Sequence, residues 1–192
     1  PGIPGSEIEL MLLLFSEIVI GVFIGLIGRI TVGALQTAGT LIALFSSLAN
    51  AMIRDPIAEQ QSSLIATFLS LLGTVLIIIA DLHHLMIRGV LESYSLFQPG
   101  QPLAFGDFSE MLTRRFAESF QLGVQLSSQF LLAAMVYYIG LGILGRLMPA
   151  LPVFIVVMPI QILGQIGFLM LTLSAFMMYF LSRFEDAIIV FL

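Results

Sequence analysis

The sequence contains no cysteine and no lysine, and only 10% of its 192 residues are charged. Without cysteine, the chain can form neither disulfide bonds nor thiolate metal sites. Twelve acidic residues outnumber seven arginines and give a formal net charge of −5. This balance argues against binding of nucleic acid or of an anionic membrane surface through basic patches.

The chain is also too apolar for a soluble domain. Hydrophobic residues make up 59% of it and the mean hydropathy is +1.09, whereas soluble domains are roughly 45–50% apolar and about 25% charged. Because a water-soluble fold needs a polar surface, a conventional soluble enzyme is excluded and we predict an integral membrane protein with one domain. The chain begins Pro1-Gly2 without a methionine or the basic region of a signal peptide. We therefore expect a fragment, a processed chain, or one whose true start is not included.

Long uncharged stretches divide the sequence into helical segments. Three stretches carry no charged residue: 60–80, 119–145 and 147–182. A helix needs about 20 apolar residues to cross the bilayer core, so the chain holds four or five candidate membrane helices. The alternating polar residues of a closed barrel are missing from these stretches. We therefore predict an all-α fold of long, membrane-associated helical hairpins.

Capping residues and prolines predict where the helices begin and end. Ser6 with Glu9, and Asp107 with Glu110, have the spacing of capping boxes, which mark helix starts. The other signals are, in chain order, an N-cap at Asp55 before Pro56, a break at 98–102, a helix end at Arg146, and a kink or the end of a first turn at Pro159.

Three of the predicted segments are unusually long. Residues 6–50 contain no proline and, as one helix, would extend roughly 65 Å, about twice the thickness of a bilayer core. Residues 56–97 and 107–145 are nearly as long. Either these segments break into tight hairpins, or the helices project beyond the membrane and are buried against partner subunits.

Glutamines recur at helical spacing in two segments. Gln121, Gln125 and Gln129 are four residues apart, and Glu118 precedes them on the same face. Gln161 and Gln165 form a second stripe. Because glutamine is costly in lipid, both stripes must face protein or water. Hydrogen bonding between helices is the favoured interpretation, and a water-filled lumen remains open.

Two charges and several glycines lie inside the first apolar segment. Glu17 and Arg29 count as intramembrane charges by hydropathy, and such residues are functional candidates by default. Placement near a helix end, or snorkelling of the side chain, explains them equally well. Gly21, Gly25 and Gly33 share a face with Arg29, and Gly140 and Gly164 lie in later segments. This pattern is typical of close helix packing.

The cluster Asp81-Leu82-His83-His84 has some features of a metal site. Two histidine ligands on one helix face are usually four residues apart, but here they are adjacent. Polar capping at the membrane boundary is therefore favoured over metal binding. Since the sequence also lacks a Ser/His/Asp arrangement, a glycine-rich phosphate loop and a carboxylate pair in an apolar segment, we predict no catalytic residue, no cofactor and no metal ion.

The polar segment 49–61 interrupts two long apolar helices. Non-helical backbone at membrane depth is tolerated only where it lines a cavity or is buried in protein. A loop that fills a pore would have this composition, and so would an exposed hairpin turn. Composition alone favours the turn.

Taken in order, several motifs resemble the FliR family of flagellar export proteins, called SctT in injectisomes. The motifs are FIGLIGR at 23–29, ALQTAG at 34–39, Asp55-Pro56 with Gln60-Gln61, DLHHLMI at 81–87 and LMPALPVF at 147–154. The resemblance covers nearly the whole chain. It also implies that the family's first helical hairpin, roughly the N-terminal quarter, is missing here.

The resemblance implies a structural role in a helical export gate and not an enzymatic one. FliR-like subunits join FliP and FliQ, with FlhB nearby, among basal-body proteins at the bacterial inner membrane. The chain would then be a single all-helical domain over 1–192 that lines the path of unfolded substrates. In the family, the loop after the second long helix plugs the closed channel, and it maps onto Ala51, Met52, Ile53, Arg54, Asp55 and Pro56.

Three other interpretations of the function compete with this one. A small secondary transporter should show inverted repeats and paired broken helices, and neither is detected. A scaffold subunit of another membrane complex is closer to the export-gate interpretation. The two differ in one respect: in an export gate, the 51–61 loop touches a lumen. A membrane-embedded enzyme would depend on Asp81, His83 and His84 alone. The resemblance of the sequence favours a flagellar system over an injectisome.

Overall fold

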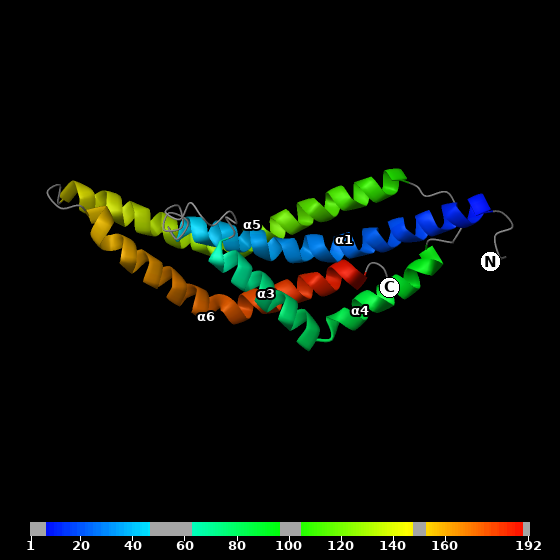
Figure 1. The fold of residues 1–192 in the computed structure, drawn as a ribbon. Coiled ribbons are helices and arrows are strands. Elements are labelled where there is room, and N and C mark those ends of the chain that lie inside the picture. Colours follow the sequence, from blue (N-terminus) through cyan, green and yellow to red (C-terminus); the bar gives the residue numbers. More distant parts are fainter. Residues whose placement is uncertain (1–6, 47–62, 97–104, 148–152, 190–192) are drawn as a thin grey trace, which may run out of the picture.

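The structure is a computed structural model of the 192-residue chain, and it describes residues 7–46, 63–96, 105–147 and 153–189. All regular elements in these ranges are α-helices: α1 (Glu7–Phe45), α3 (Leu64–Ile79), α4 (Leu82–Leu96), α5 (Phe105–Leu147) and α6 (Val153–Ile189). The predicted all-α fold is confirmed. Figure 1 shows an elongated bundle in which α1 and α5 run along the long axis and α6 returns beneath them.

The three longest helices exceed the thickness of a bilayer core. α1, α5 and α6 contain 39, 43 and 37 residues, which correspond to about 59, 65 and 56 Å at 1.5 Å per residue. Of the two alternatives open for these segments, tight hairpins are wrong for α1 and α5. The segment 56–97 does break: α3 and α4 meet at an angle of 74°, with Asp81 between them.

Some of the predicted helix ends are confirmed and others are wrong. α1 begins directly after Ser6, and Arg146 lies in the last turn of α5, as expected. The start predicted at Asp107 is wrong, because α5 begins at Phe105. Phe108, in the first turn of α5, packs edge-on against Phe23 of α1, with ring centroids 4.4 Å apart. α6 begins six residues before Pro159 and continues through it, so that the first turn does not end there. The signals at Asp55–Pro56 and 98–102 lie outside the described residues.

Two hydrophobic clusters hold the helices together. The larger contains buried side chains of α1, α3, α5 and α6, among which Leu35, Leu69, Phe130 and Phe180 are completely inaccessible. The smaller joins the first halves of α1 and α5 around Phe23. α1 therefore forms the centre of the bundle, with its most extensive contacts to α5 and then to α3.

α3 packs against α1 in the antiparallel direction, and α4 returns to α1 after the bend. The facing residues advance along α3 and α4 as they retreat along α1: Gly39 lies against Ala66, Leu35 against Gly73, and Gly28 against Met86. Figure 1 shows the elbow between α3 and α4 pointing away from α1, whereas α3 packs closely on α1 and α4 contacts it at Met86.

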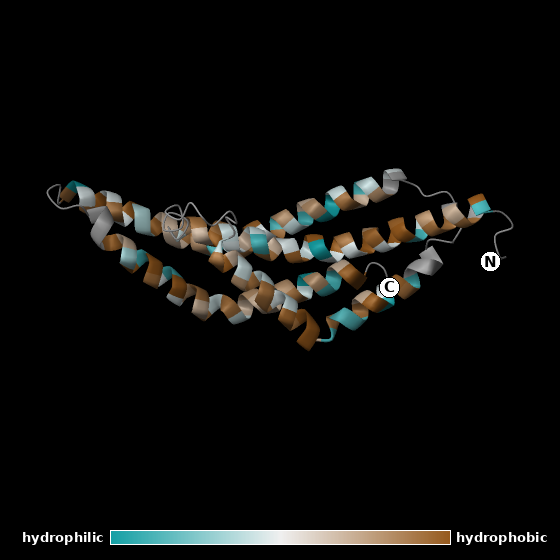
Figure 2. Cartoon of the chain, viewed as in Figure 1, coloured by the Kyte–Doolittle hydropathy of each residue, from teal (hydrophilic) through white to brown (hydrophobic). Residues whose placement is uncertain are grey.

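Much of the helix surface is apolar and uncovered. Three helices of the described chain are long and apolar enough to cross a membrane, and a fourth span results if α3 and α4 count as one. Half of the most apolar window of α1 is buried, compared with 17% for α5 and 28% for α6. Figure 2 shows the apolar residues spread over the outer faces of the bundle.

The glycines expected to mediate packing do not do so within the chain. A Cβ added at Gly21, Gly25, Gly33, Gly140 or Gly164 would meet nothing within 4 Å in the described structure. The close approaches occur at other glycines, where α3 crosses α1 and α5 crosses α1. The reason is that the buried face of α1 is set by its large apolar residues, and the Gly21–Gly25–Gly33 face points away from them.

We predict that Gly39→Ala weakens the α1–α3 contact. An added Cβ would overlap the Cα of Ala66 and lie 2.7 Å from its backbone nitrogen, and since backbone cannot move aside, the free energy of unfolding should fall by about 1–3 kcal/mol. Gly25→Ala on the same helix is the matched control. Nothing lies near it, so stability should be unchanged or rise by up to about 1 kcal/mol. Thermal unfolding in detergent measures both, and equal effects would contradict the α1–α3 packing.

Candidate functional site: a polar pocket between three helices

A polar pocket lies where α1, α5 and α6 meet. Its volume is about 250 Å³, and eight of its ten lining residues are polar: Thr31 from α1; Arg115, Glu118, Ser119, Gln121 and Gln125 from α5; and Arg183 and Asp186 from α6. Leu122 and Ala187 complete the lining. A polar recess of this kind in a bundle with apolar outer faces needs a physical reason, because each of these groups is costly to place in lipid.

The charges that line the pocket are paired with one another. Glu118 accepts hydrogen bonds from Arg114 at 3.1 Å and from Arg115 at 3.0 Å. On the opposite wall, Arg183 lies 3.9 Å from Asp186. The four charged lining residues thus balance in sign. Such a surface solvates a neutral polar chain better than it binds an ion of either sign, since neither sign of charge is left in excess.

Tyr179 links the two walls of the pocket. Its hydroxyl donates a hydrogen bond to Oε1 of Gln125 on α5, at 3.2 Å. The guanidinium of Arg183, one turn further along α6, donates to the same hydroxyl at 3.1–3.2 Å and lies 5.2 Å from the centre of the Tyr179 ring. A second link connects α5 with α1, because Ser119 donates to the carbonyl of Ile30 at 2.6 Å.

The first glutamine stripe lines the pocket in part. Gln121 and Gln125 are exposed and belong to the pocket lining together with Glu118, whereas Gln129 is half-buried further along α5. The first three members of the stripe therefore share a face that lines the pocket. Gln125 accepts a hydrogen bond from Tyr179 of α6, in agreement with hydrogen bonding between helices, and the water-filled lumen stays a prediction.

The second stripe behaves in the opposite way. Gln161 and Gln165 of α6 are both buried. Nε2 of Gln161 donates to the carbonyl of Phe45, the last residue of α1, at 3.0 Å. This is the interhelical hydrogen bond that the sequence analysis favoured. Oε1 of Gln165 is buried and has no hydrogen-bond partner among the described residues.

The other predicted site residues are placed as follows. Glu17 is half-buried on α1, and Arg29 is exposed on the same helix, about 18 Å further along the axis at 1.5 Å per residue. The two therefore do not pair with each other, as the spacing predicts. The six residues of the predicted plug, Ala51, Met52, Ile53, Arg54, Asp55 and Pro56, lie outside the described residues.

Sequence reasoning identified only three of the ten residues that line the pocket, Glu118, Gln121 and Gln125. Arg115, Tyr179, Arg183 and Asp186 each look like ordinary helix-surface residues, paired at i+3 or i+4 with a neighbour on their own helix. Only the crossing of α5 and α6 brings them together with Gln125. The available signal was the i, i+4 spacing of Tyr179 and Arg183 in a segment with few other polar groups.

Comparison with known proteins relates this chain to bacterial export proteins. Residues 2–187 match the family described as bacterial export proteins, family 1. The flagellar biosynthetic protein FliR of Caulobacter vibrioides is 34% identical over 175 residues, which are 91% of this chain and 70% of that protein.

More distant relatives follow the same pattern. FliR of Bacillus subtilis is 29% identical over 185 residues, covering 94% of this chain and 71% of its own length. The Yop proteins translocation protein T of Yersinia pestis is 26% identical over 170 residues, covering 84% of this chain and 62% of its own.

We predict that Gln161→Leu destabilises the bundle where α6 meets the end of α1. Loss of the hydrogen bond to the Phe45 carbonyl should lower the free energy of unfolding by about 1–2 kcal/mol, the size found for hydrogen bonds between helices in a membrane. Gln121→Leu is the control. Its side chain is exposed at the pocket, and the change should stay within about 0.5 kcal/mol. If both variants unfold like the wild type, the hydrogen bond contributes nothing to stability.

Proposed function

Because this chain belongs to family 1 of the bacterial export proteins, we propose that it is a non-enzymatic subunit of the flagellar export gate and forms part of the channel for unfolded substrate proteins. Its family and its three apolar helices make it a membrane-embedded component of a bacterial export apparatus. Within that role, we place residues 1–192 as one helical domain in a gate at the inner membrane, in the flagellar basal body.

The observation that carries this proposal is the mismatch between helix length and bilayer thickness. The candidate membrane span of α5 covers 40 residues, and its uncharged part, residues 119–145, is about 40 Å long, whereas a bilayer core is about 30 Å thick. Only 17% of its most apolar window is buried within the chain. Lipid can cover about 30 Å of this length, so we propose that protein partners cover the rest of its exposed apolar surface.

Sibling subunits are the partners that we propose. Exposed apolar side chains occur along α5 and α6, for example Leu132, Val136, Leu163 and Leu171. The open face of α1 around Gly25 adds a surface on which a neighbouring helix can approach closely. We infer that FliP-like and FliQ-like subunits cover these surfaces, with an FlhB-like subunit and basal-body proteins next to them.

The polar pocket supports a role next to the substrate path. An unfolded polypeptide presents neutral peptide groups and side chains of both signs. The balanced pairs Arg115–Glu118 and Arg183–Asp186, together with Gln121, match that mixture without holding any one sequence tightly. We propose that this wall of the bundle faces the lumen and keeps it hydrated.

We propose that residues 51–56 plug the closed channel. The hydrogen bond from Gln161 fixes the end of α1 at Phe45, six residues before this segment begins. Met52 and Ile53 would fill the constriction, and methionine adapts well to irregular gaps. Arg54 and Asp55 would hold the loop through charge pairing and capping. Opening would then be an order-to-disorder transition of the loop.

The absence of cysteine makes the subunit contacts directly testable. With Val136→Cys, an exposed position on α5, a cysteine-directed photo-crosslinker should join this chain to a FliP-like or FliQ-like subunit in the co-purified complex. Ala134→Cys is the matched control, because it lies two residues away on the same helix and is buried. Failure of the siblings to co-purify, or a Val136→Cys adduct with lipid alone, would contradict the proposed assembly.

Deletion of residues 51–56 should increase ion leakage through the closed gate. In complexes reconstituted in liposomes, the deletion variant and the double variant Met52→Ser/Ile53→Ser should both raise the resting conductance, because the apolar seal is lost. Replacement of residues 98–102 by a glycine-serine segment of equal length is the control and should remain sealed. Unchanged conductance in the deletion variant would overturn the plug, without affecting the assembly proposal.

A further inference from the structure

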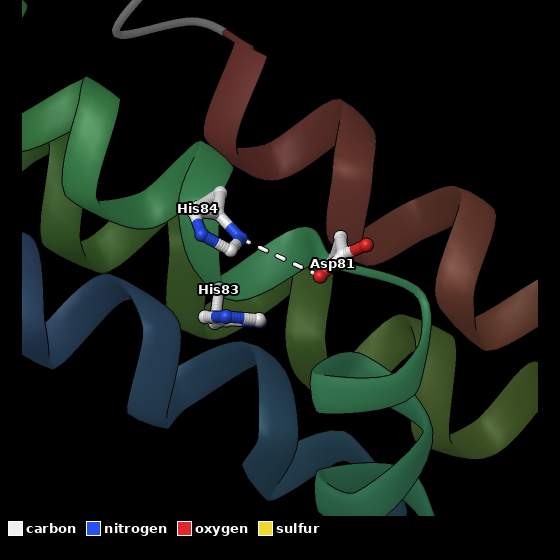
Figure 3. Close-up of side chains that lie close together, drawn as sticks. All are labelled: Asp81, His83 and His84. Atoms are coloured by element: carbon white, nitrogen blue, oxygen red, sulfur yellow. Dashed lines mark ion pairs between the residues drawn. The ribbon is translucent and has the colours of Figure 1, made fainter.

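The elbow between α3 and α4 gathers three metal-ligating side chains. Asp81 separates the two helices and has a φ of 57°, in the left-handed region that non-glycine residues rarely adopt. Figure 3 shows the side chains of Asp81 and His84 turned toward each other, with His83 beside them. One ligand atom from each of the three residues lies within 4.8 Å of the others.

The spacing of two of these atoms is close to that in a zinc site. Nδ1 of His84 lies 3.5 Å from Oδ1 of Asp81, which is long for a hydrogen bond from nitrogen to oxygen. Two ligands at 2.0–2.1 Å from one tetrahedral zinc ion are separated by about 3.3 Å. A small side-chain rotation therefore suffices to place both atoms on one ion.

His83 supplies the third ligand atom. Its ring centre lies 4.1 Å from that of His84, and its Nδ1 is buried without a hydrogen-bond partner among the described residues. A buried imidazole nitrogen without a partner is costly, and coordination of an ion by this ring would remove that cost. The neighbouring cation, Arg88, pairs with Glu92 at 2.9 Å, so its charge is balanced away from the elbow.

The break in the helix explains why the sequence pattern disfavoured a metal. Two histidines on one continuous helix need a spacing of four residues, and His83 and His84 are adjacent. The elbow adds a third ligand from outside α4, because Asp81 precedes the first residue of that helix. Asp81 and His84 are exposed at this elbow and His83 is half-buried, so an ion can reach all three residues.

We propose that Asp81, His83 and His84 bind a divalent transition-metal ion of the zinc class. Two imidazoles and one carboxylate suit zinc, and not magnesium or calcium, which prefer oxygen ligands. With three protein ligands, the fourth tetrahedral position stays open to water or to a group from a neighbouring subunit. The bound ion joins the end of α3 to the first turn of α4 and holds the elbow at its angle.

Zinc titration of the full chain tests this site. The chain is purified in detergent without a histidine tag, and calorimetry should show one zinc ion bound per chain at micromolar or lower concentration. Cobalt bound at the same site should give the visible absorption of tetrahedral coordination. A large excess of magnesium should displace neither ion. Binding seen only at millimolar zinc would overturn the proposal and leave polar capping as the role of the cluster.

Two variants separate ligation from folding. His84→Ala removes an exposed ligand, and Asp81→Gly removes the carboxylate while fitting the positive φ better, so both chains should fold. Each should weaken zinc binding by at least about tenfold, since changes to groups that merely orient metal ligands already have effects of that size. Glu110→Gln, an exposed carboxylate on α5 outside the pocket, is the control and should bind like the wild type. Zinc affinity unchanged in His84→Ala would overturn the site.

Discussion

The thickness of a lipid bilayer is the constraint on which the rest of this structure depends. A bilayer core accommodates about 30 Å of apolar helix, and α1, α5 and α6 are each close to twice that length at 1.5 Å per residue. The internal clusters cover α1 well but leave most of α5 and α6 open. A chain of this kind reaches its lowest free energy only with other proteins around it, and this is what makes an assembly subunit the natural interpretation.

The composition, together with the capping residues and prolines, predicted the framework of the fold. The excess of apolar residues and the missing charges required membrane helices, and the start of α1 and the end of α5 at Arg146 followed from local signals. The start of α5 did not follow, since the helix begins at Phe105, two residues before Asp107, a difference within the ordinary uncertainty of helix ends. Only three of the ten residues that line the polar pocket were predicted. Arg183 and Asp186 join Gln125 through the crossing of α6 over α5, which no local pattern encodes.

The two glutamine stripes show how one pattern can serve two purposes. Gln121 and Gln161 both repeat at helical spacing with a second glutamine, yet the first lines a polar pocket and the second is buried against the end of α1. The four-residue spacing of the glutamines predicts that they share a helix face. The packing of the other helices decides what that face contacts. The same is true of the glycines, since Gly39 packs closely and Gly25 on the same helix stays open.

The elbow between α3 and α4 has a consequence for topology. The bend of 74° at the elbow is compatible with two courses through a membrane, one broken span or a re-entrant loop. α3 alone has 16 residues, so it is about 24 Å long and too short to traverse the core. If the two arms form one span, Leu64 and Glu92 lie on opposite sides of the membrane, and if they form a re-entrant loop, both lie on the same side.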